Sequence, residues 1–99
     1  MSFLFEYDPA KSSRNLELHG LDFEEAQKLW NVPHVIIPAR QVGSEDRQAI
    51  IGLLFGKLYV AVFTARASTI RMISCHRADR RLQKHYERMN HEKKKGEAH

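Results

Sequence analysis

The segment from residue 58 to residue 65 restricts the fold of this chain more than any other. Both sets of alternating side chains in it are apolar, whereas a strand with one solvated face alternates apolar with polar residues. Such a strand needs cover on both faces, so we expect it at the centre of a sheet. The two sets are Leu58, Val60 and Val62 on one face and Tyr59, Ala61 and Phe63 on the other.

Three further segments have the pattern of strands that accompany this central one. Residues 49–55 are joined to it by Gly56-Lys57, a pair compatible with a tight hairpin, which predicts antiparallel pairing. Residues 70–76 follow a turn at residues 66–69 and alternate apolar with polar side chains, so one of their faces is mixed polar. A short strand is expected at residues 3–6.

A fifth strand is expected at residues 35–37, where three β-branched residues stand between Pro33 and Pro38. Because proline lacks a backbone donor, this segment is typical of an edge strand. The edge is apolar enough to pair with another chain, and Pro38 is equally suited to prevent that pairing.

Two helices are predicted near the N-terminus. Asp8-Pro9 provides an N-cap and a proline at the first helical position, and Gly20 suits a left-handed C-terminal cap after a helix ending near residue 18. Asp22, with an acidic residue three positions later, is a capping-box-like start for a second helix that ends at residues 31–33. The apolar stripe of this second helix is Phe23, Ala26 and Trp30.

The last helix is predicted from about residue 79 to residue 94 and is amphipathic and basic. Residues 93–95 are three lysines before Gly96, so we expect a domain at residues 1–92 and a basic, disordered tail at residues 93–99. The apolar stripe of the helix is Leu82, Tyr86 and Met89.

The length of 99 residues allows one compact domain and excludes a two-domain enzyme. The formal net charge is +4, but the charge is distributed unevenly. Residues 1–65 hold 6 basic and 8 acidic side chains, whereas residues 66–99 hold 10 basic and 4 acidic ones. This excess of positive charge favours a nucleic acid, an acidic protein segment or a phosphate as partner.

Several other classes of protein are disfavoured. The single cysteine, Cys75, excludes an internal disulfide framework, and the histidines lack the spacing of common metal sites. No apolar segment has the length of a membrane span, and residues 1–8 do not resemble a secretory signal. We expect a cytoplasmic protein without metal or other cofactor.

The junction between the last strand and the last helix carries the most chemistry. Arg71, His76 and Arg77 combine a guanidinium's phosphate-matching fork with an imidazole, whose reference pKa is about 6.5. Cleavage of RNA through its own 2′-hydroxyl needs a base, an acid and positive donors on the phosphate, but no metal. Such basic junctions also occur in proteins that bind nucleic acid without cutting it, so both interpretations stay open.

In order and spacing, two blocks of this sequence resemble the BrnT family of type II toxins over about residues 3–87. The first block contains Phe5-Glu6-Tyr7-Asp8-Pro9-Ala10-Lys11, Asn15-Leu16, His19-Gly20 and Asp22-Phe23-Glu24-Glu25-Ala26. The second contains Glu45-Asp46-Arg47, Ile51-Gly52, Thr64, Ile70-Arg71-Met72-Ile73-Ser74, Arg77-Ala78 and Tyr86.

The resemblance implies a small RelE-like fold and a metal-independent ribonuclease that arrests translation. It also implies neutralisation by a BrnA-type antitoxin of the ribbon-helix-helix class, with operator DNA bound only through that antitoxin. Carried over by position, the phosphate and RNA contacts are Arg47, Arg71, Arg77, Lys11, His19 and Tyr86.

The chain departs from the family pattern at four places. Leu18 stands where the family has lysine, Ala65 stands where it has an acidic residue, and Leu82 replaces a glutamate. The Ser-Ala-Arg segment reads Ser74-Cys75-His76 here, so a permanent charge becomes a titratable one. These changes either shift the acid-base chemistry towards His76 or mark a toxin of reduced activity.

Together, these observations predict an α+β single domain with a curved, mainly antiparallel sheet in the order β-α-α-β-β-β-β-α. The hypothesis is a toxin-type endoribonuclease; the alternatives are a non-catalytic RNA- or ribosome-binding module and a co-repressor acting with a DNA-binding antitoxin. The predicted catalytic residues are Arg71, His76 and Arg77, and the predicted RNA-binding residues are Lys11, His19, Arg47, Arg66, Arg80, Arg81, Lys84 and Tyr86.

Overall fold

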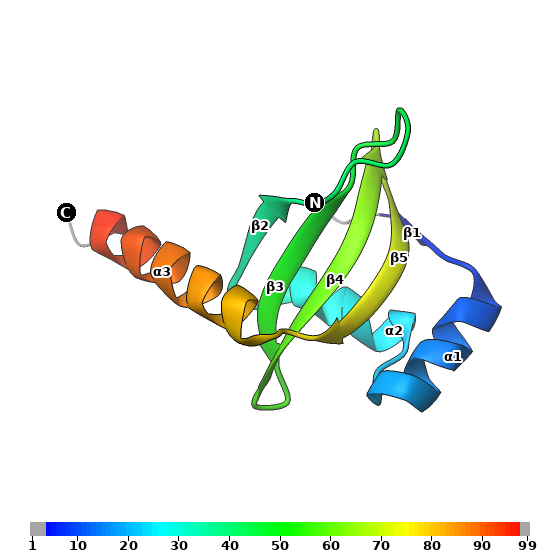
Figure 1. Ribbon diagram of the computed structural model, residues 1–99, viewed down its shortest axis with the longest axis horizontal. Coiled ribbons are helices and arrows are strands. Elements are labelled where there is room, and N and C mark those ends of the chain that lie inside the picture. The colour runs from blue at the N-terminus through cyan, green and yellow to red at the C-terminus, as the bar shows by residue number, and fades with distance from the viewer. Residues whose placement is uncertain (1–3, 98–99) are drawn as a thin grey trace.

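The computed structural model describes residues 4–97, with side chains as far as residue 91, and its elements follow the predicted order (Figure 1). Residues 1–3, where the predicted first strand begins, and residues 98–99 lie outside the described part. The elements are β1 (Leu4–Glu6), α1 (Pro9–His19), α2 (Phe23–Ala26), η1 (Gln27–Asn31), β2 (His34–Pro38), β3 (Gln48–Leu54), β4 (Lys57–Arg66), β5 (Thr69–Arg77) and α3 (Arg80–Glu97).

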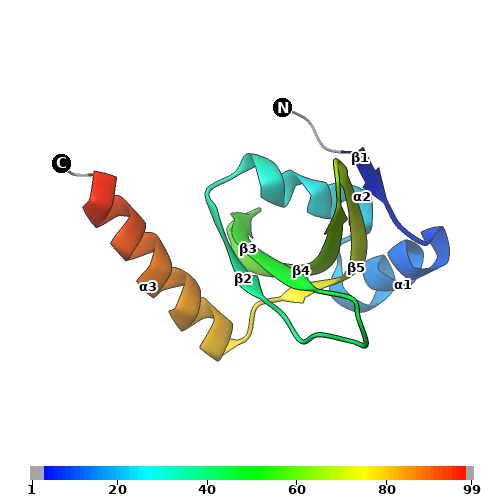
Figure 2. The same ribbon diagram turned by 90° about the horizontal axis from the view of Figure 1, so that it is seen from above.

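The described strands form one sheet in the order β1-β5-β4-β3-β2. All neighbours are antiparallel except β1 and β5, which are parallel. The predicted α+β class, the central position of β4 and the edge position of β2 are therefore confirmed. The sheet is strongly curved, with α2 and η1 on its inner side and α3 on its outer side (Figure 2). We call these two sides the inner face and the outer face.

The caps of α1 form as the sequence predicts. The Asp8 carboxylate accepts a hydrogen bond from the Ala10 backbone at 2.9 Å, and Gly20 has a left-handed φ of 73°. β1 pairs with only the first part of β5. Asn15 attaches α1 to the remaining edge of β5. Its amide donates to the Leu21 carbonyl at 2.7 Å, and its oxygen accepts from the Cys75 backbone at 3.4 Å.

The second predicted helix is split. Asp22 caps α2 as expected, accepting from the Glu25 backbone at 2.8 Å, but the chain tightens into the 3₁₀ helix η1 after Ala26. Pro33 restricts Val32, the residue before it, to extended backbone. η1 therefore ends at Asn31. η1 also approaches β3 closely: a Cβ at Gly52 would meet the Leu29 side chain at 3.1 Å.

The predicted position of the β3–β4 turn was wrong by one residue. The two turn residues are Phe55 and Gly56, with φ of 53° and 75°, and Lys57 already pairs with Leu54. A two-residue hairpin whose central residues both have positive φ matches the twist of the strands. Glycine takes one of these positions, and the exposed Phe55 takes the other.

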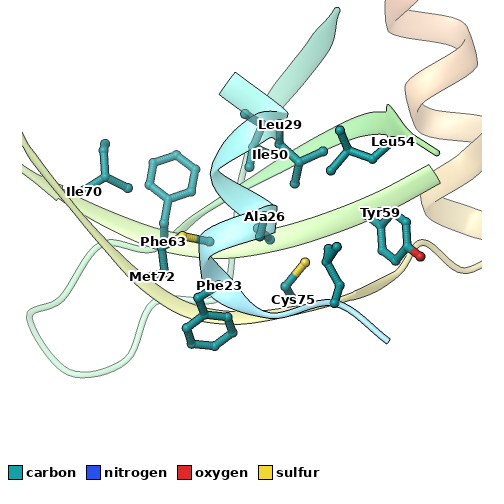
Figure 3. Close-up of a cluster of buried hydrophobic side chains, with 12 residues drawn as sticks. Phe23, Ala26, Leu29, Ile50, Leu54, Tyr59, Phe63, Ile70, Met72 and Cys75 are labelled. Atoms are coloured by element: carbon teal, nitrogen blue, oxygen red, sulfur yellow. The ribbon is translucent and has the colours of Figure 1, made fainter. Parts of the chain in front are cut away.

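Two apolar cores lie on the two faces of the sheet. The inner core fills the space under α2 and η1, where the Trp30 ring lies edge-on to Phe5 and Phe63 at centroid distances of 5.1 and 5.0 Å. The outer core is smaller and lies under α3. The inner core includes Leu21, Phe23, Ala26, Leu29, Ile50, Leu54, Tyr59, Ala61, Phe63, Ile70, Met72 and Cys75 (Figure 3), and the outer core includes Val35, Ala49, Ile51, Val60 and Ala78.

An irregularity in β5 changes which of its side chains share a face. Phe63 pairs with Met72 and Val62 pairs with Ser74, so Ile73 has no partner on β4. Such an extra residue reverses the alternation beyond it. Met72 and Cys75 consequently both enter the inner core, although a regular strand would place them on opposite faces.

The α3 helix packs its predicted apolar stripe, Leu82, Tyr86 and Met89, against the outer core. The Asp79 carboxylate accepts from the Leu82 backbone at 2.8 Å and caps the first turn. The helix runs to Glu97, beyond the predicted end near residue 94. The division of the chain at residue 92 stays a prediction.

Burial of Cys75 predicts a pH-dependent stability. Burial raises the pKa of this thiol from 9.0 to about 12. The protonated thiol therefore stabilises the fold fully below pH 9.0, and this contribution is lost as the pH rises from there towards about 12. Between about pH 8 and about pH 10.5, we expect urea denaturation to show a loss of about 2 kcal/mol in the wild type that Cys75→Ala does not show. Equal pH slopes in the two proteins would contradict this assignment.

Candidate functional site

The outer face is covered unevenly. α3 packs against β2 and β3, leaving the part formed by β4 and β5 open. The register directs Arg71, Ser74 and His76 of β5 to this part, because they pair with Thr64, Val62 and Val60, and Val60 belongs to the outer core. We call this part the open face. Five of its side chains are Thr64 and Arg66 of β4 with Arg71, Ser74 and His76 of β5, and Val62 and Thr69 lie on it as well.

The arginines of this region are held by carboxylates. Arg71 pairs with Glu6 of β1 at 3.4 Å, and both side chains are about half exposed, at 48%. Arg47, which directly precedes β3, donates from Nε to Glu45 at 2.8 Å. Exposed ion pairs contribute little to stability, so Arg71 can exchange its carboxylate for a phosphate at low cost. The Arg47–Glu45 pair is less exposed, at 29% and 33%.

The ring of His76 has a fixed orientation. Its Nδ1 lies 2.8 Å from the Arg77 carbonyl oxygen, and because a carbonyl only accepts, Nδ1 carries the hydrogen. In the neutral ring, Nε2 is then the free acceptor. The His19 ring at the end of α1 lies 6.1 Å away, centroid to centroid. Two imidazoles from distant parts of the chain therefore lie beside the open face.

Arg77 does not lie on the open face with Arg71. The bulge at Ile73 leaves Arg77 paired with Tyr59 of the inner core, and its guanidinium lies 5.9 Å from that ring centroid. With a regular strand, both arginines would share one face. Arg77 instead contacts the site through its backbone carbonyl, which orients His76.

The basic residues of the two flanking helices lie in different places. Lys11 lines a cleft of about 180 Å³ between α1 and the bulge residue Ile73, so it borders the β5 edge. α3 runs outward on the β2 side of the sheet (Figure 1) and packs chiefly against β2 and β3. Tyr86 packs on the outer core. Arg80, Arg81 and Lys84 are exposed on this helix and are not among the side chains that the β4–β5 register places on the open face.

Sequence reasoning missed the acidic partners of the site. Glu6 and Glu45 hold the two arginines, and the exposed Asp46 lies beside Glu45 in a cleft at the end of β4. Glu45-Asp46 stands next to Arg47 in one of the segments that resemble the family, but no local pattern relates it to Thr64 or Arg66. Their proximity depends on the β3–β4 pairing.

Among the side chains that the structure describes, as far as residue 91, no three histidine, cysteine or acidic groups gather as a metal site would require. Among the helices of residues 4–97, none is long and apolar enough to cross a membrane.

This is a small α+β domain with arginines and two histidines around an open sheet face. Such a basic surface is typical of proteins that bind polyanions. Over residues 7–81 the chain matches the family described as ribonuclease toxin, BrnT, of type II toxin-antitoxin system. The chain belongs to this family, and the resemblance seen in the sequence is confirmed. No curated protein matches it significantly. The family is one of ribonuclease toxins, which implies RNA as substrate and an antitoxin as partner.

Proposed function

We propose that this protein is a metal-independent endoribonuclease that arrests translation by cutting RNA on the open face. The observation that carries the proposal is the arrangement of Arg71 with two imidazoles, His76 and His19, around one uncovered part of the sheet. Because its substrate is RNA engaged in translation, we place its action in the cytoplasm.

The proposed reaction is transfer of the phosphodiester to the neighbouring 2′-hydroxyl. His76 Nε2 takes the proton of that hydroxyl, whose oxygen attacks phosphorus, while the bond to the 5′-oxygen breaks. His19 donates a proton to this leaving oxygen. The products are a 2′,3′-cyclic phosphate and a free 5′-hydroxyl. Arg71 stabilises the charge that develops on the phosphate oxygens.

Other positive groups have supporting roles in this proposal. Arg47 holds a phosphate beside the reacting one, Lys11 does the same along the β5 edge, and Arg66 contacts the neighbouring nucleotide at the end of β4. Arg77 positions His76 through its carbonyl. Arg80, Arg81 and Lys84 attract RNA from α3, where Tyr86 is a packing residue rather than a base contact.

The test is incubation of antitoxin-free protein with naked total RNA in EDTA, followed by mapping of new ends. We expect Arg71→Ala to slow cleavage by about 10²- to 10³-fold, as for loss of a donor to a developing oxyanion. Arg77→Ala is the matched control on the other face and should slow it less than about tenfold. Equal losses in the two variants would contradict the assignment of Arg71 to the site.

Intact RNA with persistent, salt-sensitive binding would instead favour a non-catalytic binding module or a ribosome-dependent toxin. With regard to partners, we propose a BrnA-type ribbon-helix-helix antitoxin that places acidic side chains on the open face. Operator DNA would then be bound only through the antitoxin. The co-repressor alternative predicts that DNA binding by that antitoxin changes with this protein while no RNA is cut.

A further inference from the structure

A second polar space borders the open face, between the β2–β3 loop and the end of β4. It is a cleft of about 390 Å³, large enough for one nucleobase. Acidic and basic groups both line it, so it offers hydrogen-bond acceptors and donors to the same occupant. The lining residues are Ser44, Glu45, Asp46, Thr64, Ala65 and Arg66.

The acidic wall of the cleft is held by a tight turn. Val42 and Glu45 exchange backbone hydrogen bonds of 3.2 and 3.0 Å, and Gly43 between them has a left-handed φ of 61°. The Glu45 carboxylate is partly neutralised by Arg47 at 2.8 Å. Asp46 makes no ion pair with any side chain of the described range, so its two oxygens remain available as acceptors.

The floor of the cleft contains a polar group that nothing in the described chain satisfies. Thr64 is 3% exposed, and none of the hydrogen bonds between described residues uses its hydroxyl. No fully enclosed side-chain nitrogen or oxygen in that range lacks a partner, so this hydroxyl keeps some access to solvent, and Thr64 lines the cleft. A buried hydroxyl directed into a cleft favours a polar occupant over an apolar one.

The cleft is also next to the proposed reaction centre. Thr64 and Arg71 are direct cross-strand partners, and side chains in such pairs stand about 4.5 to 5.5 Å apart at Cβ. A base seated over Thr64 therefore belongs to a nucleotide whose phosphate lies at Arg71.

We propose that this cleft binds a guanine base and makes the cleavage guanine-directed, an inference that rests on the proposed function. Guanine alone among the four RNA bases presents two adjacent donors, N1–H and N2–H, which match the two oxygens of one carboxylate. Asp46 accepts both of them. Arg66 donates to guanine O6 or N7, a pairing that arginine makes preferentially.

The experiment measures binding of four RNA octamers that differ only in one central nucleotide, with 2′-O-methyl groups so that they cannot be cleaved. We expect the guanine octamer to bind about 10- to 100-fold more tightly than the other three, because one bidentate contact discriminates by about this much. An octamer with inosine, which lacks the N2 donor, should lose most of this preference.

Asp46→Asn keeps the shape of the side chain and should abolish the preference while the other octamers bind within about threefold of the wild type. Glu87→Gln, an exposed change of the same charge on α3, is the control and should retain the preference. Equal affinities for all four octamers, or a preference that survives in Asp46→Asn, would overturn the guanine site.

The guanine site can fail while the proposed function stands, and the same octamers distinguish the two outcomes. Octamers that bind without base preference, with affinity lost in Arg71→Ala, would overturn the guanine site and leave the RNA-cleaving face standing. Absence of binding to every octamer would overturn both.

Discussion

Replacing His76 with alanine should slow RNA cleavage by about 10²- to 10⁴-fold, the usual contribution of a general acid or base. The ring is partly exposed and makes one side-chain hydrogen bond within the described chain, to the Arg77 carbonyl, so its loss leaves both cores intact. Cleavage rates on naked RNA in EDTA, with thermal unfolding monitored by circular dichroism, separate the chemical effect from any loss of structure.

His85→Ala is the matched control for this variant. His85 lies on α3, where its Nδ1 accepts from Arg88 at 3.2 Å, and it takes no part in the proposed chemistry. We expect less than about a twofold change in rate. An unchanged rate in His76→Ala would remove this residue from the mechanism and leave Arg71 and His19 as the remaining candidates.

Replacing Phe63 with alanine should lower the free energy of unfolding by about 3 to 5 kcal/mol, as for other large-to-small changes in cores. Phe63 is 2% exposed and lies between β4 and η1, with the Trp30 ring edge-on at 5.0 Å. Its removal leaves a cavity that the curved sheet and the short 3₁₀ helix cannot readily close. For a domain of this size, stability totals only about 5 to 15 kcal/mol, so the melting temperature should fall strongly.

Phe55→Ala is the matched control, because it deletes the same ring from an exposed position. Phe55 is 65% exposed at the β3–β4 turn, with Lys28 5.5 Å from its ring centroid. We expect a change within about 0.5 to 1 kcal/mol by urea denaturation. Comparable losses in the two variants would mean that the inner core is not the main source of stability.

The open face illustrates how far sequence reasoning reaches at a site. Arg71 and His76 were chosen because a guanidinium and an imidazole near a strand end suit phosphate chemistry, and both lie on the open face. Arg77 was grouped with them because it follows His76 at the same strand end, and in a regular strand it would also share a face with Arg71. The extra residue at Ile73 places Arg71 and Arg77 on opposite faces of the sheet. The proximity of His19 and His76 was also beyond the sequence, because α1 and β5 meet only through tertiary packing.

The sequence by itself determined the elements whose signals are local. Two apolar sets in residues 58–65 placed β4 at the centre of the sheet, and two prolines placed β2 at its edge. Asp8 and Gly20 set the limits of α1. These signals are local because caps and periodicity act within a few residues. Only the tertiary structure decided the bulge in β5, the split of the second helix and the grouping of Arg71 with the histidines. These depend on which residues pair across the sheet, a choice governed by burial and register over the whole chain rather than by local preference.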